Sequence, residues 1–267
     1  MTTAMAESDG SSRDLLFEVR EGIGYVVFNR PETRNALTFA MYERLAEICA
    51  AAGRDDGPDV LVISGAGGRA FAAGTDISQF RAFRTTDDAL DYEKRMDDVL
   101  GAVERCRVPT IAAIAGACTG GGAAIATACD LRLATRELKF GFPIARTLGN
   151  CLSTANLDRL SALIGAGRTR DLIFTARLMG AEEALTAGLV SEVVDDYPAL
   201  QARASDLAKR IRGFAPLTLH ATKEALRRLR LGERADDDLI AMCYTSEDFR
   251  EGIEAFLAGR PPQWKGR

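Results

Sequence analysis

The chain has 267 residues, 47% of them hydrophobic and 27% charged, with a formal net charge of −4 at pH 7. This length and composition suit one large folded domain with a full hydrophobic core. The net charge and a pI near 5.3 argue against a broad surface for nucleic acid or anionic membranes, though a local basic pocket is compatible with them.

Residues 1–13 are small and polar and show no apolar period, so we expect a flexible leader there. The leader lacks the basic start and the apolar stretch of a signal peptide. The six cysteines are scattered and form no CxxC pair. This usage favours reduced thiols and a cytoplasmic location, with no metal site.

The next part of the chain predicts strand, strand, helix and strand. Two apolar runs within residues 15–30 surround Glu21 and Gly22, which indicates a β-hairpin. Residues 37–53 place apolar side chains on one helical face and end at a glycine. The β-branched run 59–67 is typical of a strand that is covered on both faces.

A second unit follows, with a helix from Thr86, a strand at 110–116, a helix that opens on glycines, and a strand at 130–135. No residue from Val108 to Cys129 is charged, a length that raises the question of a membrane span. Pro109 and the triple glycine 120–122 favour a buried strand, a tight turn and a buried helix instead. Alternating strands and helices predict a layered α/β architecture with crossover connections.

After Leu157 the β signals are sparse, and the chain reads as helical to about Ala258 with one short strand. We therefore expect a core over residues 14–200 and a helical C-terminal region over residues 201–267. The late helices are amphipathic and need a neighbour to cover their apolar faces. An oligomer would supply that neighbour, and packing against the same chain is a comparable alternative.

Two loops join an apolar strand to a helix through small residues: "GGRAFAAGTDISQF" (67–80) and "GACTGGGAAIATACD" (116–130). Glycine and alanine let a turn present backbone N–H groups where a larger side chain would obstruct a ligand. A helix that opens at the triple glycine also aims free N–H groups and a partial positive charge forward. Two such turns facing each other could hold a developing oxyanion, whereas close helix-to-strand packing explains either turn alone.

Together these segments resemble the crotonase, or enoyl-CoA hydratase/isomerase, superfamily. The resemblance rests on six blocks in the family's order: "FNRPETRNAL" (28–37), "GGRAFAAGTDI" (67–77), "VPTIAAIAGACTGGGAAIATACDLRLAT" (108–135), "AEEALTAGLVSEVV" (181–194), "PLTLHATKEAL" (216–226) and "SEDFREGIEAFLAGRPPQWKGR" (246–267). It implies a spiral of β-β-α units and a C-terminal helical region that forms a homotrimer or a dimer of trimers. The ligand would be an acyl-CoA thioester, with coenzyme A as part of the substrate and no permanently bound cofactor.

By motif position, the resemblance assigns the two backbone N–H groups that bind the thioester carbonyl to Thr75 and Gly121. The family commonly has alanine where this chain has Thr75, which changes the pocket mouth and keeps the backbone donor. The resemblance also implies contacts to the coenzyme A moiety, some from the substrate loop and some from basic residues that could equally be surface charges: Ala73, Asp76, Ile77, Arg30, Arg34, Lys223 and Lys265.

The glutamates that serve as acid and base in the family's hydratases are absent. Their positions fall on Ala124 and on Ile144, or on Ala145 if the loop is counted from its far end. Positioned acid/base groups are each worth roughly 100- to 10,000-fold in rate, so ordinary hydratase turnover needs a substitute. Other branches of the superfamily place an acid further along this segment, where this chain has Asn150, Cys151 and Ser153, with Arg146 close by in sequence. The more remote alternatives are His220, Asp158 and Asp248.

We therefore expect an enzyme of the enoyl-CoA hydratase/isomerase type with atypical acid/base residues. The alternatives are a catalytically silent acyl-CoA-binding paralogue and another crotonase chemistry, such as an isomerase, a dehalogenase, or a thioester or C–C bond hydrolase. A Clp-type serine protease would need a Ser-His-Asp set. His220 is the only histidine and is far from any nucleophile motif.

Overall fold

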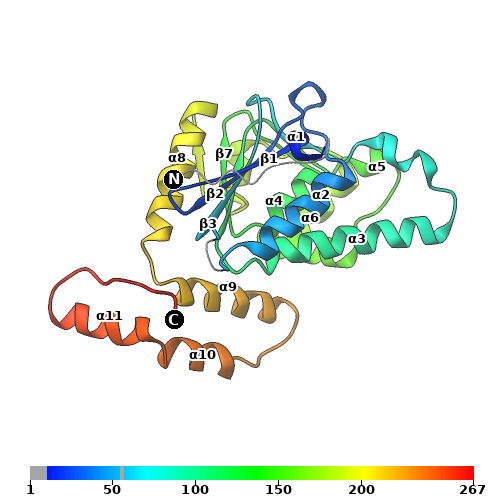
Figure 1. Cartoon of the computed structure of the whole chain (residues 1–267). Helices are drawn as coiled ribbons and strands as arrows, with labels where there is room; N and C mark the ends of the chain where they lie inside the picture. Colours follow the sequence, from blue (N-terminus) through cyan, green and yellow to red (C-terminus); the bar gives the residue numbers. More distant parts are fainter. Residues whose placement is uncertain (1–10, 55–56) are drawn as a thin grey trace.

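The computed structural model describes residues 11–54 and 57–267, and in it two sheets form the centre of the molecule (Figure 1). The larger sheet has the strand order β1-β2-β3-β5-β7-β9, and the smaller one has the order β4-β6-β8. β1 and β2 pair antiparallel, and every other pairing in the two sheets is parallel. Most of the predicted leader, residues 1–10, lies outside the described residues, and the described chain begins with the short helix α1 (Ser11–Asp14).

The strands are β1 (Leu15–Arg20), β2 (Ile23–Phe28), β3 (Val60–Gly65), β4 (Ala70–Ala73), β5 (Thr110–Ile114), β6 (Ala117–Thr119), β7 (Leu131–Thr135), β8 (Lys139–Gly141) and β9 (Glu192–Val194). The helices after α1 are η1 (Pro31–Thr33), α2 (Phe39–Ala51), η2 (Ile77–Ala82), α3 (Thr86–Glu104), α4 (Gly121–Ala128), α5 (Ile144–Thr147), α6 (Thr154–Thr175), α7 (Ala181–Thr186), α8 (Tyr197–Arg212), α9 (Pro216–Arg230), α10 (Asp237–Tyr244) and α11 (Glu247–Leu257).

A repeated β-β-α unit builds the fold. From β3 onward the first strand of each unit joins the large sheet and the second joins the small one, as β3 and β4, β5 and β6, and β7 and β8 do, whereas β1 and β2 both join the large sheet. This arrangement confirms the predicted α/β spiral with a helical C-terminal region. The predicted hairpin, the helices α2, α3 and α4, and the strands β3, β5 and β7 are all present.

The small sheet was not predicted. Its strands have only three or four residues, too few to show the β-branched alternation that marks a strand. The chain must bend sharply to pass from one sheet to the other. At Gly65 a side-chain Cβ would lie 2.2 Å from the carbonyl oxygen of Ala70, so glycine permits this bend between β3 and β4.

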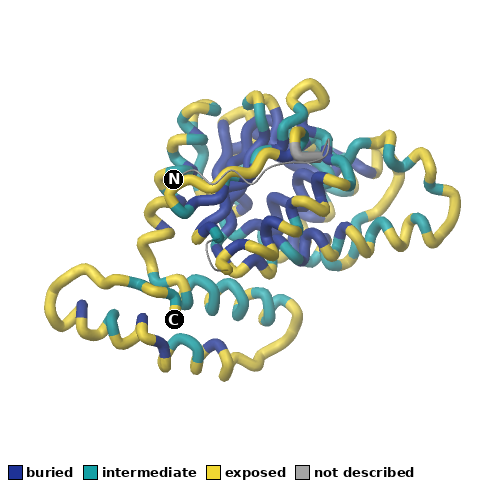
Figure 2. Tube along the Cα trace, viewed as in Figure 1, coloured by how far each residue is buried: buried dark blue, intermediate teal, exposed yellow. Residues whose placement is uncertain are grey.

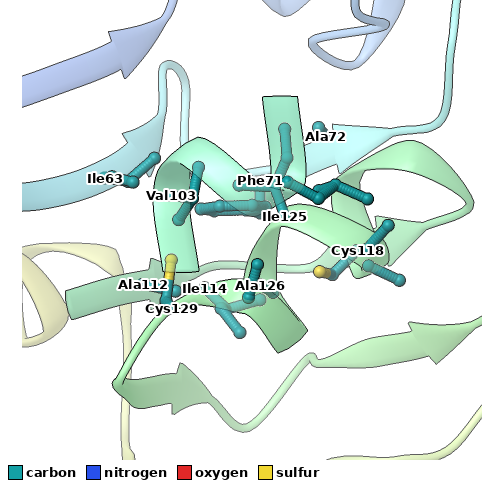
Figure 3. Packing of buried hydrophobic residues seen from close by; sticks show 14 of the residues in the cluster. Ile63, Phe71, Ala72, Val103, Ala112, Ile114, Cys118, Ile125, Ala126 and Cys129 are labelled. Carbon is teal, nitrogen blue, oxygen red and sulfur yellow. The ribbon is translucent and has the colours of Figure 1, made fainter. Parts of the chain in front are cut away.

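The two faces of the large sheet pack against different helices. On one face, alternate residues such as Val62, Ile111 and Leu133 pack against Leu200 and Ala204 of α8. The opposite face belongs to the main core, in which α2, α3 and α4 cover the sheets. Figure 3 shows how the small side chains of α4 let it approach the surrounding strands closely.

The last three helices, α9 to α11, form an arm that extends from the rest of the molecule (Figures 1 and 2). α8 packs on the sheet, so the predicted boundary at residue 200 falls inside this helix and the arm begins at Pro216. Lys223 attaches the arm to the core, because its Nζ donates to Asp130 Oδ2 at 2.7 Å. No helix among the described residues combines the length and the apolar character that crossing a membrane would require.

The side chain of Asn35 connects the segment around η1 to the connection between β3 and β4. Its backbone is left-handed, with φ of 57°, and its side chain is fully buried. The side-chain Nδ2 donates to the carbonyl oxygens of Ala66 and Ala70, while Oδ1 accepts from the N–H of Arg30. Asparagine suits this position because it tolerates the left-handed region and satisfies three buried or partly buried backbone groups at once.

We therefore predict that Asn35→Ala lowers the free energy of unfolding by about 3 kcal/mol, since three buried or partly buried backbone groups lose their partner. Urea denaturation followed by circular dichroism measures this change. Glu21→Ala is the matched control, because Glu21 is also left-handed, with φ of 50°, but is exposed. Equal effects of the two substitutions would contradict a stabilising role for the Asn35 side chain.

Candidate active site

A cavity of about 210 Å³ lies where α3, α4, the turn after β4 and the segment 143–156 meet. Most of its lining is apolar. The lining residues are Tyr42, Ala73, Gly74, Thr75, Ile77, Phe80, Tyr92, Glu93, Met96, Leu100, Thr119, Gly120, Gly121, Ala124, Pro143, Ile144, Thr147, Leu148, Asn150, Cys151, Leu152 and Asn156.

The two glycine turns predicted to form a site face each other in this cavity. Gly74 and Gly120 both have positive φ, of 96° and 51°, and a Cβ on Gly120 would lie 3.4 Å from the Cα of Gly74. Glycine is favoured at both positions because side chains rarely adopt such backbone angles.

The turns leave two amide groups free next to the cavity. Leu37 donates to Gly74 O and Asp76 donates to Leu37 O, so the N–H of Thr75, between them, has no acceptor among the described residues. The first backbone bond of α4 runs from Ala124 N to Gly120 O, which leaves the N–H of Gly121 at the free N-terminus of the helix. An oxygen that gains negative charge could accept from both amides.

Packing around the triple glycine leaves no room for larger residues. A Cβ on Gly121 would lie 1.8 Å from Tyr42 Oη and 3.1 Å from Thr75 Oγ1. A Cβ on Gly122 would lie 2.3 Å from the carbonyl oxygen of Ala72. The start of α4 therefore reaches the turn at Thr75 only because both positions are glycine.

Three hydroxyl groups lie behind the amides. Thr75 Oγ1 is 2.9 Å from Tyr42 Oη and 3.3 Å from Tyr92 Oη, both within hydrogen-bond distance. Burial raises the pKa of both tyrosines, so each phenol stays neutral at physiological pH. The Thr75 side chain, which distinguishes this chain from the alanine common in the family, is thus held by two neutral phenols.

The positions of the two expected glutamates are apolar in the structure as well. Ala124 and Ile144 are both buried and both line the cavity, whereas Ala145 is exposed and lies outside it. Of the two alternative positions for the second glutamate, only Ile144 lines the cavity.

The residues predicted to substitute for the acid/base glutamates occupy different places in the structure. Asn150 and Cys151 line the cavity and are exposed at its rim, whereas Arg146 is exposed on α5 and does not line it. No hydrogen bond joins Arg146 to Cys151 among the described residues, so the structure gives no support for an Arg146–Cys151 pair at the cavity. Ser153 caps α6 by accepting from Asn156 N.

The remote alternatives have structural roles. Asp158 pairs with Arg230 of α9, and the buried Asp248 accepts from the backbone N–H groups of Lys265 and Gly266. His220 lies in the groove between the arm and the core, and burial lowers its pKa. None of the three lines the cavity.

Glu93 of α3 is a lining carboxylate that the sequence reasoning missed. It is half-buried, and its neighbours Tyr92 and Met96 on the same helix also line the cavity. The available signal was its place beside the apolar stripe of α3, which runs through Tyr92, Met96 and Leu100. Which part of that stripe meets the cavity depends on tertiary packing and is not encoded locally.

The residues predicted to contact coenzyme A occupy different environments. Ala73 and the exposed Ile77 line the cavity mouth. Arg30 instead donates to Asp76 Oδ2 at 3.0 Å, and Asp76 Oδ1 caps η2 by accepting from Ser78 N. Both side chains hold the substrate loop in place. These interactions also lower the pKa of the Asp76 carboxyl, chiefly through its hydrogen bond with Ser78.

The remaining basic candidates also differ. Arg34 is exposed, and its carbonyl oxygen accepts from the N–H of Ala73 at the cavity mouth. Lys223 is engaged with Asp130 and with the carbonyl oxygens of Val103 and Val108, away from the lining residues. Lys265 lies near Glu247, in the groove between the arm and the core.

Comparison with known proteins agrees with this architecture. Residues 18–267 match the family model described as Enoyl-CoA hydratase/isomerase. The chain is 31% identical to a short-chain-enoyl-CoA hydratase of Clostridium acetobutylicum, over 92% of this chain and 95% of that protein. It is 35% identical to an (E)-benzylidenesuccinyl-CoA hydratase of Thauera aromatica, over 93% of this chain and 98% of that protein.

A solved structure shows the same fold. The crystal structure of an enoyl-CoA hydratase/carnithine racemase from Magnetospirillum magneticum superposes with a TM-score of 0.87 at 33% identity, covering 95% of this chain and 96% of that one. Fold, turns and sequence thus agree over nearly the whole chain. The chain belongs to the enoyl-CoA hydratase/isomerase family, the crotonase superfamily.

Proposed function

We propose that the protein binds an acyl-CoA thioester and stabilises its enolate in an oxyanion hole formed by the N–H groups of Thr75 and Gly121. The observation that carries the proposal is the pair of amides without acceptors at one end of the cavity. The partial positive charge at the N-terminus of α4 adds to the field at the carbonyl oxygen. Polarising that carbonyl acidifies the neighbouring C–H bonds, which is the chemistry shared by hydratases and isomerases.

The acyl group enters the apolar part of the cavity. Phe80, Met96, Leu100, Ile144 and Leu148 line this part, and none of them carries a polar side chain. Phe80 also packs edge-on against Tyr92, with ring centroids 4.8 Å apart. This lining supports a hydrophobic acyl substituent of modest size, since burial of apolar surface is favourable.

Coenzyme A is part of the substrate in this proposal and not a resident cofactor. Its phosphates lie near Arg34 at the cavity mouth, and Ala73 and Ile77 contact the pantetheine side of the thioester. Lys265 is a second candidate for the phosphates. Arg30, Asp76 and Lys223 act indirectly, because their charges are engaged in contacts that hold the loop and the arm.

The absence of carboxylates at Ala124 and Ile144 favours one second candidate. A paralogue that binds acyl-CoA without turning it over would keep the amides and lose the acid/base pair. Neither the dehalogenase nor the hydrolase alternative has such a specific observation in its favour. Turnover of an acyl-CoA panel that includes crotonyl-CoA distinguishes an enzyme from a silent binder.

The apolar surface of the arm supports assembly into a trimer or a dimer of trimers. We place this assembly in the cytoplasm. Phe256 and Leu257 at the end of α11 are 86% and 80% exposed. Together with Phe249 and Ile253 they line a mostly apolar groove on the arm. Exposed apolar surface on this scale is typical of an interface between subunits.

Thr75→Pro removes one amide donor of the proposed hole, and we predict a loss of about 100-fold or more in kcat/KM. Thr75→Ala keeps the amide and should retain activity within about 10-fold, since it loses only hydroxyl contacts. Steady-state kinetics with the best acyl-CoA substrate measures both variants, and thermal melts check that each one folds. Similar rates for the two variants would exclude the Thr75 amide as a donor.

Arg34→Ala should weaken binding of butyryl-CoA about three- to ten-fold, because one exposed cation near the phosphates is lost. Isothermal titration calorimetry gives the dissociation constant, and the effect should shrink at high ionic strength. Arg44→Ala is the matched control, since Arg44 is exposed on α2 and paired with Glu47. Unchanged binding in Arg34→Ala would remove Arg34 from the site.

Replacing both Phe256 and Leu257 with Asp should dissociate the assembly, because two charges would be placed in the apolar interface. Analytical ultracentrifugation measures the mass of the particle. Leu90→Asp is the control, since Leu90 is 62% exposed on α3, outside the arm. An unchanged mass of the double variant would show that the end of α11 is not at the interface.

A further inference from the structure

The cavity holds one carboxylate among its described lining residues, and this residue is not at either family position. Glu93 lines the cavity together with Thr75, Gly121 and Ala124. We propose that Glu93 of α3 is the catalytic group that transfers a proton to and from the substrate carbon next to the thioester carbonyl. The inference rests on the proposed function, because it needs an acyl-CoA whose carbonyl oxygen is held by the two amides.

The other titratable groups in the lining are poorly suited to this role. Tyr42 and Tyr92 are phenols whose pKa values burial raises further, so at neutral pH they cannot act as bases. Cys151 lies exposed at the rim, and no hydrogen bond joins its thiol to a basic residue among the described side chains. Of the four groups, Glu93 alone combines partial burial with a carboxylate.

Glu93 also lacks the partners that engage other carboxylates nearby. Asp97, one turn further along α3, accepts from Ser153 Oγ at 2.8 Å and lies 3.9 Å from Arg159. Glu104, at the end of the helix, is bound by Arg159 and Arg230. Within the described chain, no hydrogen bond or ion pair connects Glu93 to another residue. Its carboxyl group is therefore free to accept or donate a proton.

The surroundings of Glu93 favour its protonated form more than water does. Burial is the main cause of its raised pKa, and the charge of Asp97 on the same helix adds to the shift. A carboxylate with a raised pKa is a stronger base, and the neutral acid it becomes can return the proton at higher pH than an ordinary glutamic acid.

Glu93 lines the same cavity as Thr75 and Gly121, the residues of the proposed oxyanion hole. The adjacent Tyr92 reaches Thr75, with its Oη 3.3 Å from Thr75 Oγ1. α3 also packs against α4, whose first residue is Gly121. A thioester oxygen bound to the two amides would thus lie in the cavity that one face of α3 lines. A carboxylate on that face can approach the reacting carbon.

The proton transfer balances without any further reactant. In a 3-enoyl-CoA, the C–H bond beside the carbonyl breaks, its proton passes to a Glu93 carboxylate oxygen, and its electron pair moves to the thioester oxygen. When the enolate collapses, the neutral Glu93 returns the proton either to the same carbon or to the far end of the dienolate. The first outcome exchanges hydrogen with solvent, and the second shifts the double bond into conjugation.

The test compares Glu93→Gln, Glu93→Asp and Asp91→Asn with the wild-type protein. The measurement is mass-spectrometric deuterium uptake at the carbon next to the carbonyl of 3-hexenoyl-CoA in D₂O, together with double-bond migration. Glu93→Gln should lose about 100-fold or more in rate, and Glu93→Asp should recover part of it. Asp91→Asn should match the wild type, because Asp91 is an exposed carboxylate on the same helix, outside the cavity.

The pH profile distinguishes proton transfer from a merely structural role. The wild-type rate should rise with pH through a group titrating above the usual range of glutamate, and this limb should be absent in Glu93→Gln. The charged and titratable groups near Glu93 are Tyr92 and Asp97 on α3, Tyr42 on α2, Cys151 before α6, and Arg159 of α6. Asp97→Asn should move the limb to lower pH, because it removes the charge that opposes ionisation of Glu93.

Failure of the Glu93 proposal and failure of the proposed function give different results in these measurements. Equal wild-type and Glu93→Gln rates, with both reduced by Thr75→Pro, would overturn the role of Glu93 and leave the proposed function intact. A wild-type protein that binds 3-hexenoyl-CoA by calorimetry but gives neither exchange nor migration would overturn both the role of Glu93 and the enzymatic function, and would favour the silent binder.

Discussion

The backbone bends at Gly74 and Gly120 are the constraint on which the rest of the site depends. Each bend carries a positive φ, and the two lie almost in contact. Because the chain turns there, the amides of Thr75 and Gly121 leave the hydrogen-bond pattern of their own strand and helix and stay free. The double-layered spiral is the frame that brings two such bends, from successive units, to the same point.

The packing behind the amides involves two further helices. Thr75 contacts two phenols, those of Tyr42 on α2 and Tyr92 on α3, and Tyr42 occupies the space that a side chain on Gly121 would need. The position of the turn thus depends on α2 and α3 as well as on the strands. The Arg30–Asp76 ion pair holds the same turn, and Asn35 holds the connection between β3 and β4 that precedes it.

The sequence was sufficient to predict the fold, through the family resemblance, and the two glycine turns, because glycines and apolar runs are local features of the chain. The strands of the small sheet were missed, since segments of three or four residues are too short to give a periodic signal. Lys223 was expected to bind phosphate from its position in the family pattern. Its partner in the structure, Asp130, lies 93 residues earlier, and only tertiary structure brings the two together. Glu93 was missed for the same kind of reason, because local periodicity locates the inner stripe of α3 but not what that stripe faces.

The position of Glu93 has an evolutionary consequence. In the family pattern the acid/base positions correspond to Ala124 on α4 and Ile144 at the start of α5, and neither lies on α3. Here Glu93 shares α3 with Met96 and Leu100, which shape that chamber. Any mutation that shifts or rotates α3 to admit a different acyl group must also displace the carboxylate. Substrate range and proton transfer would therefore evolve together in this lineage, whereas a chain with glutamates at the usual positions can change one while keeping the other.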